Sequence, residues 1–241
     1  MSEDRPFEFL VERPDGAQPL VHLTFDESHS LTSFTDALAL AENAGRTASI
    51  WVHGTNAERQ THLESMGFTS NRTLLQMSAP LPNQTTDVVT RAFTENDIDE
   101  FVDVNNRAFS WHPEQSGLTA DAVRNDMGQP WFDPEGFRLH HIDGKLAAFC
   151  WTKRHYDSGT SGTSEDSGEA HVGEIYVIAV DPPFHGRGLG KALTLAGLEH
   201  LSSLGITNSM LYVESDNTAA VATYEKLGFT VSRTDTLWRH P

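Results

Sequence analysis

The middle of the chain holds two apolar-rich runs separated by a turn pair. Phe137–Ile142 and Lys145–Lys153 flank Asp143-Gly144, which suits a type I′ turn, so they predict a β-hairpin. Thr94 and Thr119 each precede a segment whose apolar residues recur with helical spacing, and a threonine at such a position is typical of a helix N-cap.

Apolar and amphipathic segments alternate in the rest of the C-terminal two thirds. The predicted elements are a strand at 88–93, a helix from 94 to about 108, a strand at 172–180, a helix to about 204, a strand at 209–214, a helix at 217–227 and a last strand from 229. Strands that alternate with helices favour an α/β sandwich built on a mixed sheet. Residues 157–168 contain no large apolar side chain, which predicts a mobile loop.

An internal repeat links the two ends of the chain. Residues 51–72 match residues 212–233 without a gap, and each copy predicts a strand, an Asn-capped helix, a Gly-Phe turn and a strand. The identical pairs are Val52/Val213, Asn56/Asn217, Glu64/Glu225, Gly67/Gly228, Phe68/Phe229, Thr69/Thr230 and Arg72/Arg233.

The segment at residues 78–86 contains two prolines and a polar run, and it can continue neither a helix nor a strand. We therefore predict a partial, structural lobe at 1–80, a linker at 81–87 and a main domain at 88–241.

Composition narrows the classes of partner. The 241 residues carry a formal charge of −17 and are 38% apolar, which is enough to bury a core. No basic cluster is longer than Lys153-Arg154, so we expect neither nucleic acid nor an anionic membrane as a partner. A monomer is the expected state. No apolar run approaches the length of a membrane span and the acidic start lacks an apolar signal segment, which favours a soluble, cytoplasmic protein.

A metal site is not expected. Cys150 is the single cysteine, and the adjacent His140 and His141 should point to opposite faces of a strand.

The segment from Val180 to Lys191 joins a predicted strand directly to a helix. Glycines at 186, 188 and 190 would let backbone N–H groups approach an anion at the positive end of the helix dipole. Such a loop could hold a pyrophosphate even in a strongly acidic protein. Taken alone, an ordinary glycine-rich turn explains the segment equally well, because glycine motifs are weak signals.

The context of that loop resembles the GNAT acetyltransferase superfamily. The residues that carry the resemblance are Arg187-Gly188-Leu189-Gly190 between a strand and a helix, Asn217 after the next strand, Tyr224 and Leu227-Gly228-Phe229. The resemblance covers residues 88–241 strongly and the first copy of the repeat weakly. It implies the GNAT fold, of the α/β (α+β) class: a central mixed, mostly antiparallel sheet flanked by helices, here preceded by a truncated GNAT-like lobe. His185 departs from the family pattern, which has Gln or Arg there.

Further motifs are similar to those of the mycothiol synthase family, whose members have tandem GNAT domains. These motifs are Asn105-Asn106-Arg107-Ala108-Phe109, His112-Pro113-Glu114-Gln115, Trp131-Phe132-Asp133-Pro134-Glu135-Gly136, Trp151-Thr152-Lys153, Gly173-Glu174-Ile175-Tyr176-Val177 and Leu211-Tyr212-Val213-Glu214-Ser215-Asp216-Asn217. The resemblance implies transfer of acetyl from acetyl-CoA to the cysteinyl amine of Cys-GlcN-Ins, a cysteine linked to glucosaminyl-inositol. In the first lobe, residues 24–30 have two acids and no glycine where the loop should be, so this lobe is not expected to bind acetyl-CoA.

The same resemblance implies two catalytic residues. Glu174 would take the amine proton through a water molecule, and Tyr224 would protonate the departing thiolate. A solvated glutamate at a strand end and a tyrosine packed on Leu227 and Phe229 remain the alternatives.

Acetyl-CoA and the acceptor have implied sites as well. The residues implied for acetyl-CoA are Ile178, Ala179, Val180, His185, Gly186, Arg187, Gly188, Leu189, Gly190, Lys191, Asn217, Thr218, Ala219, Ala220 and Val221. Residues 178–180 would pair with the pantetheine amides and supply an oxyanion donor, and residues 185–191 would hold the pyrophosphate. Helix capping explains Asn217 equally well. The residues implied for the acceptor are Glu114, Lys153, Glu174 and Tyr212.

Two other functions stay open at this point. The chain could be another GNAT N-acetyltransferase, acting on a protein N-terminus, an aminoglycoside or a small amine. It could also be a non-catalytic module that binds an acyl-CoA.

Overall fold

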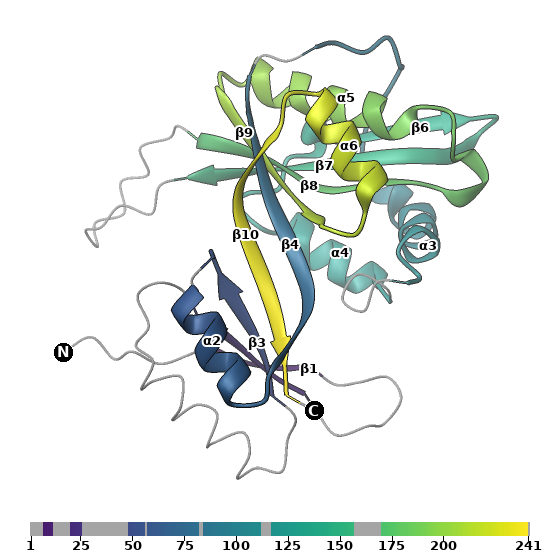
Figure 1. Ribbon diagram of the computed structural model, residues 1–241. Helices are drawn as coiled ribbons and strands as arrows, with labels where there is room; N and C mark the ends of the chain where they lie inside the picture. Colours follow the sequence, from purple (N-terminus) through teal and green to yellow (C-terminus); the bar gives the residue numbers. More distant parts are fainter. Residues whose placement is uncertain are drawn as a thin grey trace, which may run out of the picture. The chain divides into compact units, whose positions relative to one another are not determined.

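The computed structural model describes residues 7–11, 20–25, 48–55, 57–81, 84–111, 117–156 and 170–240 (Figure 1). The chain forms two compact units. Unit 1 comprises residues 1–77, 212–221 and 231–241, and unit 2 comprises residues 78–211 and 222–230. In the described ranges, no helix combines the length and the apolar character that crossing a membrane requires.

Unit 1 is a sheet with a helix and the first residues of another helix, α6 (Thr218–Lys226). Its elements are β1 (Phe7–Val11), β2 (Leu20–Phe25), β3 (Ala48–His53), α2 (Ala57–Ser65), most of β4 (Thr69–Pro80) and most of β10 (Thr230–Arg239). The strand order is β1-β2-β3-β10-β4, and the pair β2/β3 is parallel whereas β1/β2 and β3/β10 are antiparallel. Ile50, Leu63, Phe68 and Leu237 are buried, so the sheet and α2 share an apolar core.

Unit 2 holds the longer part of the predicted main domain. Its elements are β5 (Arg91–Ala92), η1 (Glu95–Asp97), α3 (Ile98–Ala108), α4 (Ala120–Met127), η2 (Pro134–Gly136), β6 (Phe137–Ile142), β7 (Lys145–Tyr156), β8 (Ala170–Val180), η3 (Pro182–Phe184), α5 (Leu189–Ser203), the start of β9 (Asn208–Glu214) and the end of α6 (Thr218–Lys226). The strand order is β4-β9-β8-β7-β6-β5, with β8/β9 parallel and the pairs from β5 to β8 antiparallel. This mixed, mostly antiparallel sheet confirms the predicted fold class.

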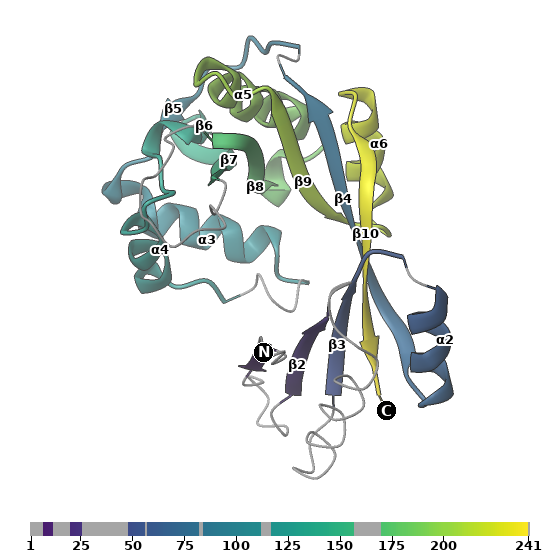
Figure 2. The same cartoon turned by 90° about the vertical axis from the view of Figure 1, so that its left-hand side faces the viewer.

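Helices cover both faces of the unit 2 sheet. Figure 2 shows α5 on one side of β6, β7 and β8, and α3 and α4 on the other. On the α3 side, Phe137 stacks between Phe93 at 4.2 Å and Trp151 at 4.6 Å between ring centroids. On the α5 side, Gly197 lies so close to β7 that a Cβ there would be 2.6 Å from the sulfur of Cys150. Burial raises the pKa of the Cys150 thiol to about 12, so this cysteine is an uncharged core residue.

Most predicted elements are present, and local residues explain their ends. Asp143 and Gly144 have positive φ angles of 51° and 75°, as a type I′ turn requires. The Thr119 hydroxyl accepts the N–H of Ala122 at 3.2 Å and caps α4.

The strand predicted at 88–93 is wrong in length, because only Arg91 and Ala92 pair with β6. The carbonyls of Val89 and Thr90 instead accept hydrogen bonds from the side chains of His140 and Arg138 on β6, at 2.8 and 3.1 Å. Side-chain bonds therefore take the place of the backbone ladder at this edge.

The two copies of the repeat have the same local structure. Each runs from a strand into a helix, a turn and a long strand: β3-α2-β4 and β9-α6-β10. Gly67 and Gly228 have φ angles of 86° and 88°, and the next residue closes each turn. The backbone N–H of Phe68 donates to the carbonyl of Leu63, and that of Phe229 to the carbonyl of Tyr224, both at 3.0 Å.

The compact units follow another division than the predicted boundaries at 80 and 88. Residues 212–221 and 231–241, which the sequence assigned to the main domain, belong to the same unit as the N-terminal lobe. A stretch of β9, part of α6 and nearly all of β10 are thereby grouped with β3 and α2.

Candidate active site

The glycine loop begins at an ion pair between a buried aspartate and a half-exposed arginine. Asp181 follows β8 directly, and its carboxylate accepts two hydrogen bonds from the Arg107 guanidinium on α3, at 3.0 and 3.1 Å. Its backbone N–H donates to the carbonyl of Ala147 on β7 at 2.9 Å. A bidentate pair of this kind fixes both position and orientation, so the start of the loop is attached to two neighbouring elements.

The loop leads into α5 through two glycines in the left-handed region. Gly186 and Gly188 have φ angles of 77° and 76°, and a Cβ on either would meet no atom within 4 Å. The space beside them is therefore open to a ligand. The first N–H groups of a helix have no partner within that helix, which makes the N-terminus of α5 a favourable place for an anion. The ring Nε2 of His185 is 2.9 Å from the carbonyl oxygen of Val180 and ties the loop back to the strand.

Strand β8 separates from its parallel neighbour as it approaches this loop. In the part of the chain that the structure describes, β8 pairs with β9 at residues 173–175, whereas on its other side it pairs with β7 up to Val180. On the side of β8 opposite β7, the backbone of residues 178–180 therefore has no described strand beside it. An extended ligand with amide groups could pair along this edge as an added strand does.

Glu174 is placed where β8 still pairs on both sides. It lies opposite Lys153 on β7 and Met210 on β9, and it is 7% exposed. Its Oε2 is 2.7 Å from the Nε2 of His155 on β7. His155 was not among the candidates from the sequence. It lies two residues after Lys153 on β7, and residues two apart in a strand share a face, so this spacing could have indicated it.

Lys153 lies over two aromatic rings. Its Nζ is 4.6 Å from the ring centroid of Trp131 and 5.0 Å from that of Tyr176, which are cation–π distances. Burial raises the pKa of Asp126 on α4, while the positive charge of Lys153 acts in the opposite direction. Burial also raises the pKa of Tyr176, and the charges of Asp126 and Glu174 add to this rise. Lysine, carboxylates and rings therefore form one cluster, and Trp131 and Tyr176 are further members that the sequence reasoning missed.

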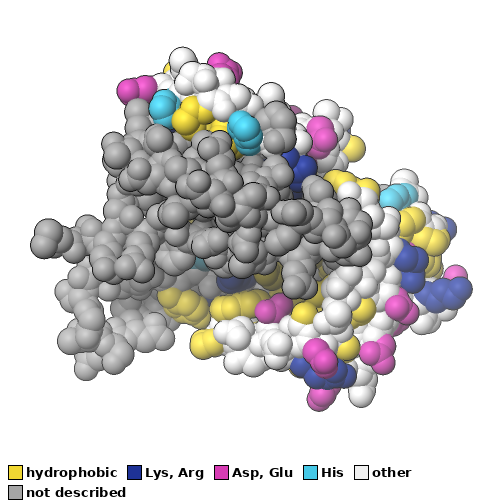
Figure 3. Space-filling model, turned by 90° about the horizontal axis from the view of Figure 1, so that it is seen from below, with side chains coloured by type: hydrophobic (Ala, Val, Ile, Leu, Met, Phe, Trp, Pro, Cys, Tyr) yellow, Lys and Arg dark blue, Asp and Glu magenta, His cyan; other side chains and the backbone are white. Residues whose placement is uncertain are grey.

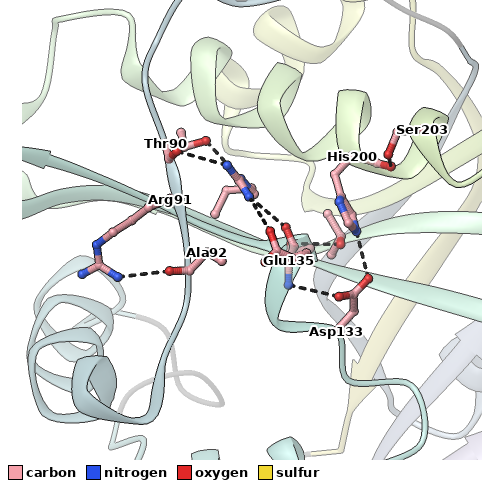
Figure 4. Close-up of polar contacts among 10 residues, drawn as sticks. Thr90, Arg91, Ala92, Asp133, Glu135, His200 and Ser203 are labelled. Atoms are coloured by element: carbon pink, nitrogen blue, oxygen red, sulfur yellow. Dashed lines mark hydrogen bonds and ion pairs between the residues drawn. The ribbon is translucent and has the colours of Figure 1, made fainter.

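The segment that carries Trp131 is fixed by a polar network (Figure 4). Asp133 accepts the backbone N–H of Glu135 at 3.0 Å and contacts the ring Nε2 of His200 on α5 at 2.9 Å. The hydroxyl of Thr152 donates to the carbonyl of Gly136 at 2.9 Å, and a Cβ on Gly136 would be 2.3 Å from that hydroxyl oxygen. Small size at Gly136 thus lets this turn pack directly on β7.

Tyr224 is almost entirely buried on α6. It is 8% exposed, and its ring packs on that of Phe229 with 6.0 Å between centroids. Burial raises the pKa of its phenol, with a smaller contribution from Cys150. The hydroxyl therefore keeps its proton at neutral pH, and its implied role as an acid stays a prediction.

The remaining implied residues lie outside unit 2 or outside the description. Residues 217–221 belong to unit 1, where Asn217 caps α6 by accepting the N–H of Ala220 at 3.2 Å. Tyr212, also in unit 1, is partly exposed, and its hydroxyl accepts a hydrogen bond from Arg233 at 3.2 Å. Glu114 and the loop at 157–168 fall on residues that the structure does not describe.

Charged side chains are mixed on the visible surface. On the face in Figure 3, basic side chains of the described residues lie beside acidic ones. Arg124 pairs with Asp121 at 3.0 Å and Arg138 with Glu135 at 3.4 Å. Within the described ranges, no three His, Cys, Asp or Glu side chains are grouped as a metal site would need.

Comparisons with known proteins show the family of this chain. The model of the acetyltransferase (GNAT) family matches residues 98–229, more than half of the chain. The chain is 45% identical to the mycothiol acetyltransferase of Mycolicibacterium gilvum strain PYR-GCK, over 82% of this chain and 65% of the relative. It is 38% identical to the mycothiol acetyltransferase of Streptomyces coelicolor, over 92% of this chain and 71% of the relative. The first of these relatives is therefore matched over less than two thirds of its length.

A solved structure shows the same fold at low identity. A GCN5-related N-acetyltransferase from Sphaerobacter thermophilus superposes with a TM-score of 0.68 at 18% identity, over 95% of this chain and 79% of that chain. At this identity the likeness concerns the fold alone.

Proposed function

The chain belongs to the acetyltransferase (GNAT) family, and from this premise we propose that it transfers acetyl from acetyl-CoA to the cysteinyl amine of Cys-GlcN-Ins. The products are mycothiol and CoA. The observation that carries the proposal is the edge of β8 at residues 178–180, which has no described strand beside it and follows the buried Glu174 by four residues on the same strand. An acyl donor paired along this edge would share the strand with a proton acceptor at Glu174, and relatives named mycothiol acetyltransferases suggest the acceptor.

Two segments of unit 2 bind acetyl-CoA in this proposal. The pantetheine amides pair with the backbone of residues 178–180, one of whose N–H groups polarises the acetyl carbonyl. The pyrophosphate lies on residues 185–191 at the N-terminus of α5. Open space at Gly186 and Gly188 fits this placement, because a bulky group can approach the backbone there.

Proton transfers complete the reaction. Glu174 takes a proton from the acceptor ammonium through a water molecule, which frees the nitrogen lone pair to attack the acetyl carbon. The C–S bond of the tetrahedral intermediate then breaks, and the CoA thiolate takes the hydroxyl proton of Tyr224. The attacking nitrogen loses its second proton through water, and this proton restores the tyrosine. Because burial raises the pKa of Tyr224, that proton is present at neutral pH. The remaining roles rest on the sequence resemblance, which assigns Lys153, Tyr212 and Glu114 to the polyhydroxyl acceptor and residues 217–221 to acetyl-CoA.

The division of labour between the lobes belongs to the same proposal. Leu63 occupies the position in the first copy that Tyr224 occupies in the second. The first copy therefore lacks a hydroxyl at the place of the acid, which supports a structural lobe at residues 1–80 joined by a linker to a catalytic part at 88–241. A cytoplasmic monomer remains the expectation from the sequence.

The decisive test is acceptor-dependent release of CoA. Purified protein is given acetyl-CoA with Cys-GlcN-Ins, simple amines or a peptide N-terminus, and the acetylated product is identified by mass because mycothiol has its own thiol. Selective turnover of Cys-GlcN-Ins is expected. Turnover of another amine alone would move the chain to a different GNAT acceptor, and binding of acetyl-CoA without turnover of any acceptor would make it a binding module.

Two variants test the assigned residues. Glu174→Gln and Tyr224→Phe should each lower kcat by roughly a hundredfold or more, as loss of a general base or acid does. Glu135→Gln, an exposed carboxylate on η2, serves as the matched control and should retain activity. Wild-type kcat across pH in either variant would remove that residue from the mechanism.

A further inference from the structure

The buried carboxylate of Glu174 is hydrogen-bonded to the side chain of His155. Burial of a charge is costly unless hydrogen bonds compensate it. Among the described residues, the hydrogen bond made by the carboxylate of Glu174 is the one with His155, at 2.7 Å between Oε2 and Nε2. An ionised carboxylate can only accept, so Nε2 carries the hydrogen and donates it.

The other charged groups around this pair are engaged elsewhere. The Lys153 ammonium, opposite Glu174 on β7, faces the rings of Trp131 and Tyr176. On α4, Asp126 adds a negative charge that faces Lys153 and Tyr176, and Tyr176 itself is the remaining titratable group on β8. On the β9 side, Glu174 pairs with the uncharged Met210. His155 is therefore the group that stabilises the ionised form of Glu174 by direct contact.

From this geometry we infer that His155 is the positioning residue of the base. By occupying Oε2, it holds the carboxylate in one orientation and leaves Oε1 for the water that bridges to the acceptor amine. The inference rests on the proposed function, in which Glu174 is the base. His155 does not touch the reacting atoms, and its side chain is 38% exposed, so it acts through Glu174 from the solvent side.

Two substitutions separate the hydrogen bond from the bulk of the ring. His155→Phe keeps a ring of similar size and removes the donor, whereas His155→Gln keeps an N–H donor. We expect His155→Phe to lower kcat/KM for Cys-GlcN-Ins by roughly tenfold to a hundredfold, the range that one hydrogen bond to a charged group supplies. His155→Gln should stay within about threefold of the wild type. His141→Phe, which breaks another His–Glu contact of unit 2, should leave kcat/KM unchanged.

The pH profile separates positioning from a merely structural role. Loss of a donor to the ionised carboxylate favours its protonation, so the acid limb of kcat/KM should move to higher pH in His155→Phe and stay close to wild type in His155→Gln. Wild-type activity and profile in His155→Phe would overturn the inference. Equal damage in both variants would also overturn it, because a hydrogen-bond donor would then be insufficient.

A spectroscopic measurement keeps the inference testable if His155→Phe does not fold. In wild-type protein labelled with 15N-histidine, the resonance that is lost in His155→Gln should show the Nε2–H tautomer, and it should change in Glu174→Gln. The Nδ1–H tautomer would refute the assigned contact. Failure of the proposed function would instead appear as a wild-type protein that does not acetylate Cys-GlcN-Ins, whatever the state of His155.

Discussion

Replacement of Asp97 by asparagine tests how much one buried carboxylate stabilises unit 2. Asp97 ends the short turn before α3 and is 7% exposed. Its two oxygens accept hydrogen bonds from the Arg91 guanidinium at 2.7 and 2.5 Å, and Oδ2 also accepts the backbone N–H and the hydroxyl of Thr94, each at 2.8 Å. This network joins the edge strand β5 to the start of α3.

The pKa of Asp97 provides the magnitude. Hydrogen bonds from Arg91 and then from Thr94 lower it from 3.8 to about 2, against the opposing effect of burial. At about 1.36 kcal/mol per pKa unit, ionisation stabilises the folded state by roughly 2 kcal/mol. Because the folded-state pKa is the lower one, the unfolded chain takes up the proton first as the pH falls. The contribution is therefore complete at pH 7, roughly halved near pH 3 and lost near pH 2.

Urea unfolding followed by tryptophan fluorescence measures this contribution. Asp97→Asn should lower the free energy of unfolding by roughly 2 kcal/mol at pH 7, and the gap to wild type should shrink by about half at pH 3. Asp121→Asn is the matched control, because Asp121 also pairs with an arginine but its side chain is 91% exposed, and its loss should have no measurable effect. A gap that is equal at both pH values, or absent at pH 7, would refute the reasoning.

Three glycine and tryptophan substitutions give further predictions. Gly188→Ala strains a left-handed backbone by about 1–2 kcal/mol and should raise KM for acetyl-CoA in steady-state assays, whereas Gly144→Ala, with a similar φ of 75°, should leave KM unchanged. Trp131→Leu removes one of the rings under Lys153 and should raise KM for the acceptor a few-fold while kcat is kept. Gly197→Ala forces a Cβ to within 2.6 Å of the Cys150 sulfur and should destabilise the fold by about 1–3 kcal/mol, measured as a lower Tm.

Opposite outcomes would contradict these expectations directly. An equal rise of KM in Gly144→Ala would mean that general destabilisation, not the loop, controls acetyl-CoA binding. Trp111→Leu removes an exposed indole, and a similar effect there would remove the argument from Trp131. Unchanged Tm in Gly197→Ala would mean that α5 can move away from β7.

Secondary structure was predictable where the signal is local. Asp143-Gly144 specifies its turn through the positive φ angles that these two residues tolerate, and Thr119 specifies a helix start through its hydroxyl. The strand at 88–93 was predicted too long because its apolar pattern does not show that Arg138 and His140 would bind its carbonyls. These two residues lie about 50 positions away, so no local pattern contains that information.

The candidate site shows the same limit. Glu174 and Lys153 were identified from motifs, but their position opposite each other depends on the register in which β7 pairs with β8. A register shift between Trp151 and Thr152 also changes which residues share a face. One extra residue in a strand reverses which face the following side chains point to. The position of Tyr176 next to Lys153 could therefore not be predicted from the sequence.

The two copies of the repeat show why the fold could be predicted from the sequence more completely than the chemistry. In both, a glycine with positive φ and a buried phenylalanine close the turn after a helix, with the same hydrogen bond at 3.0 Å. That geometry depends on backbone freedom and apolar burial, which both sequences supply. The residue whose backbone carbonyl accepts this hydrogen bond is leucine in one copy and tyrosine in the other, and both side chains are buried. Packing tolerates either, so the repeat predicts the local structure of both copies, whereas the phenolic hydroxyl that the proposed mechanism requires is present in the second copy and not in the first.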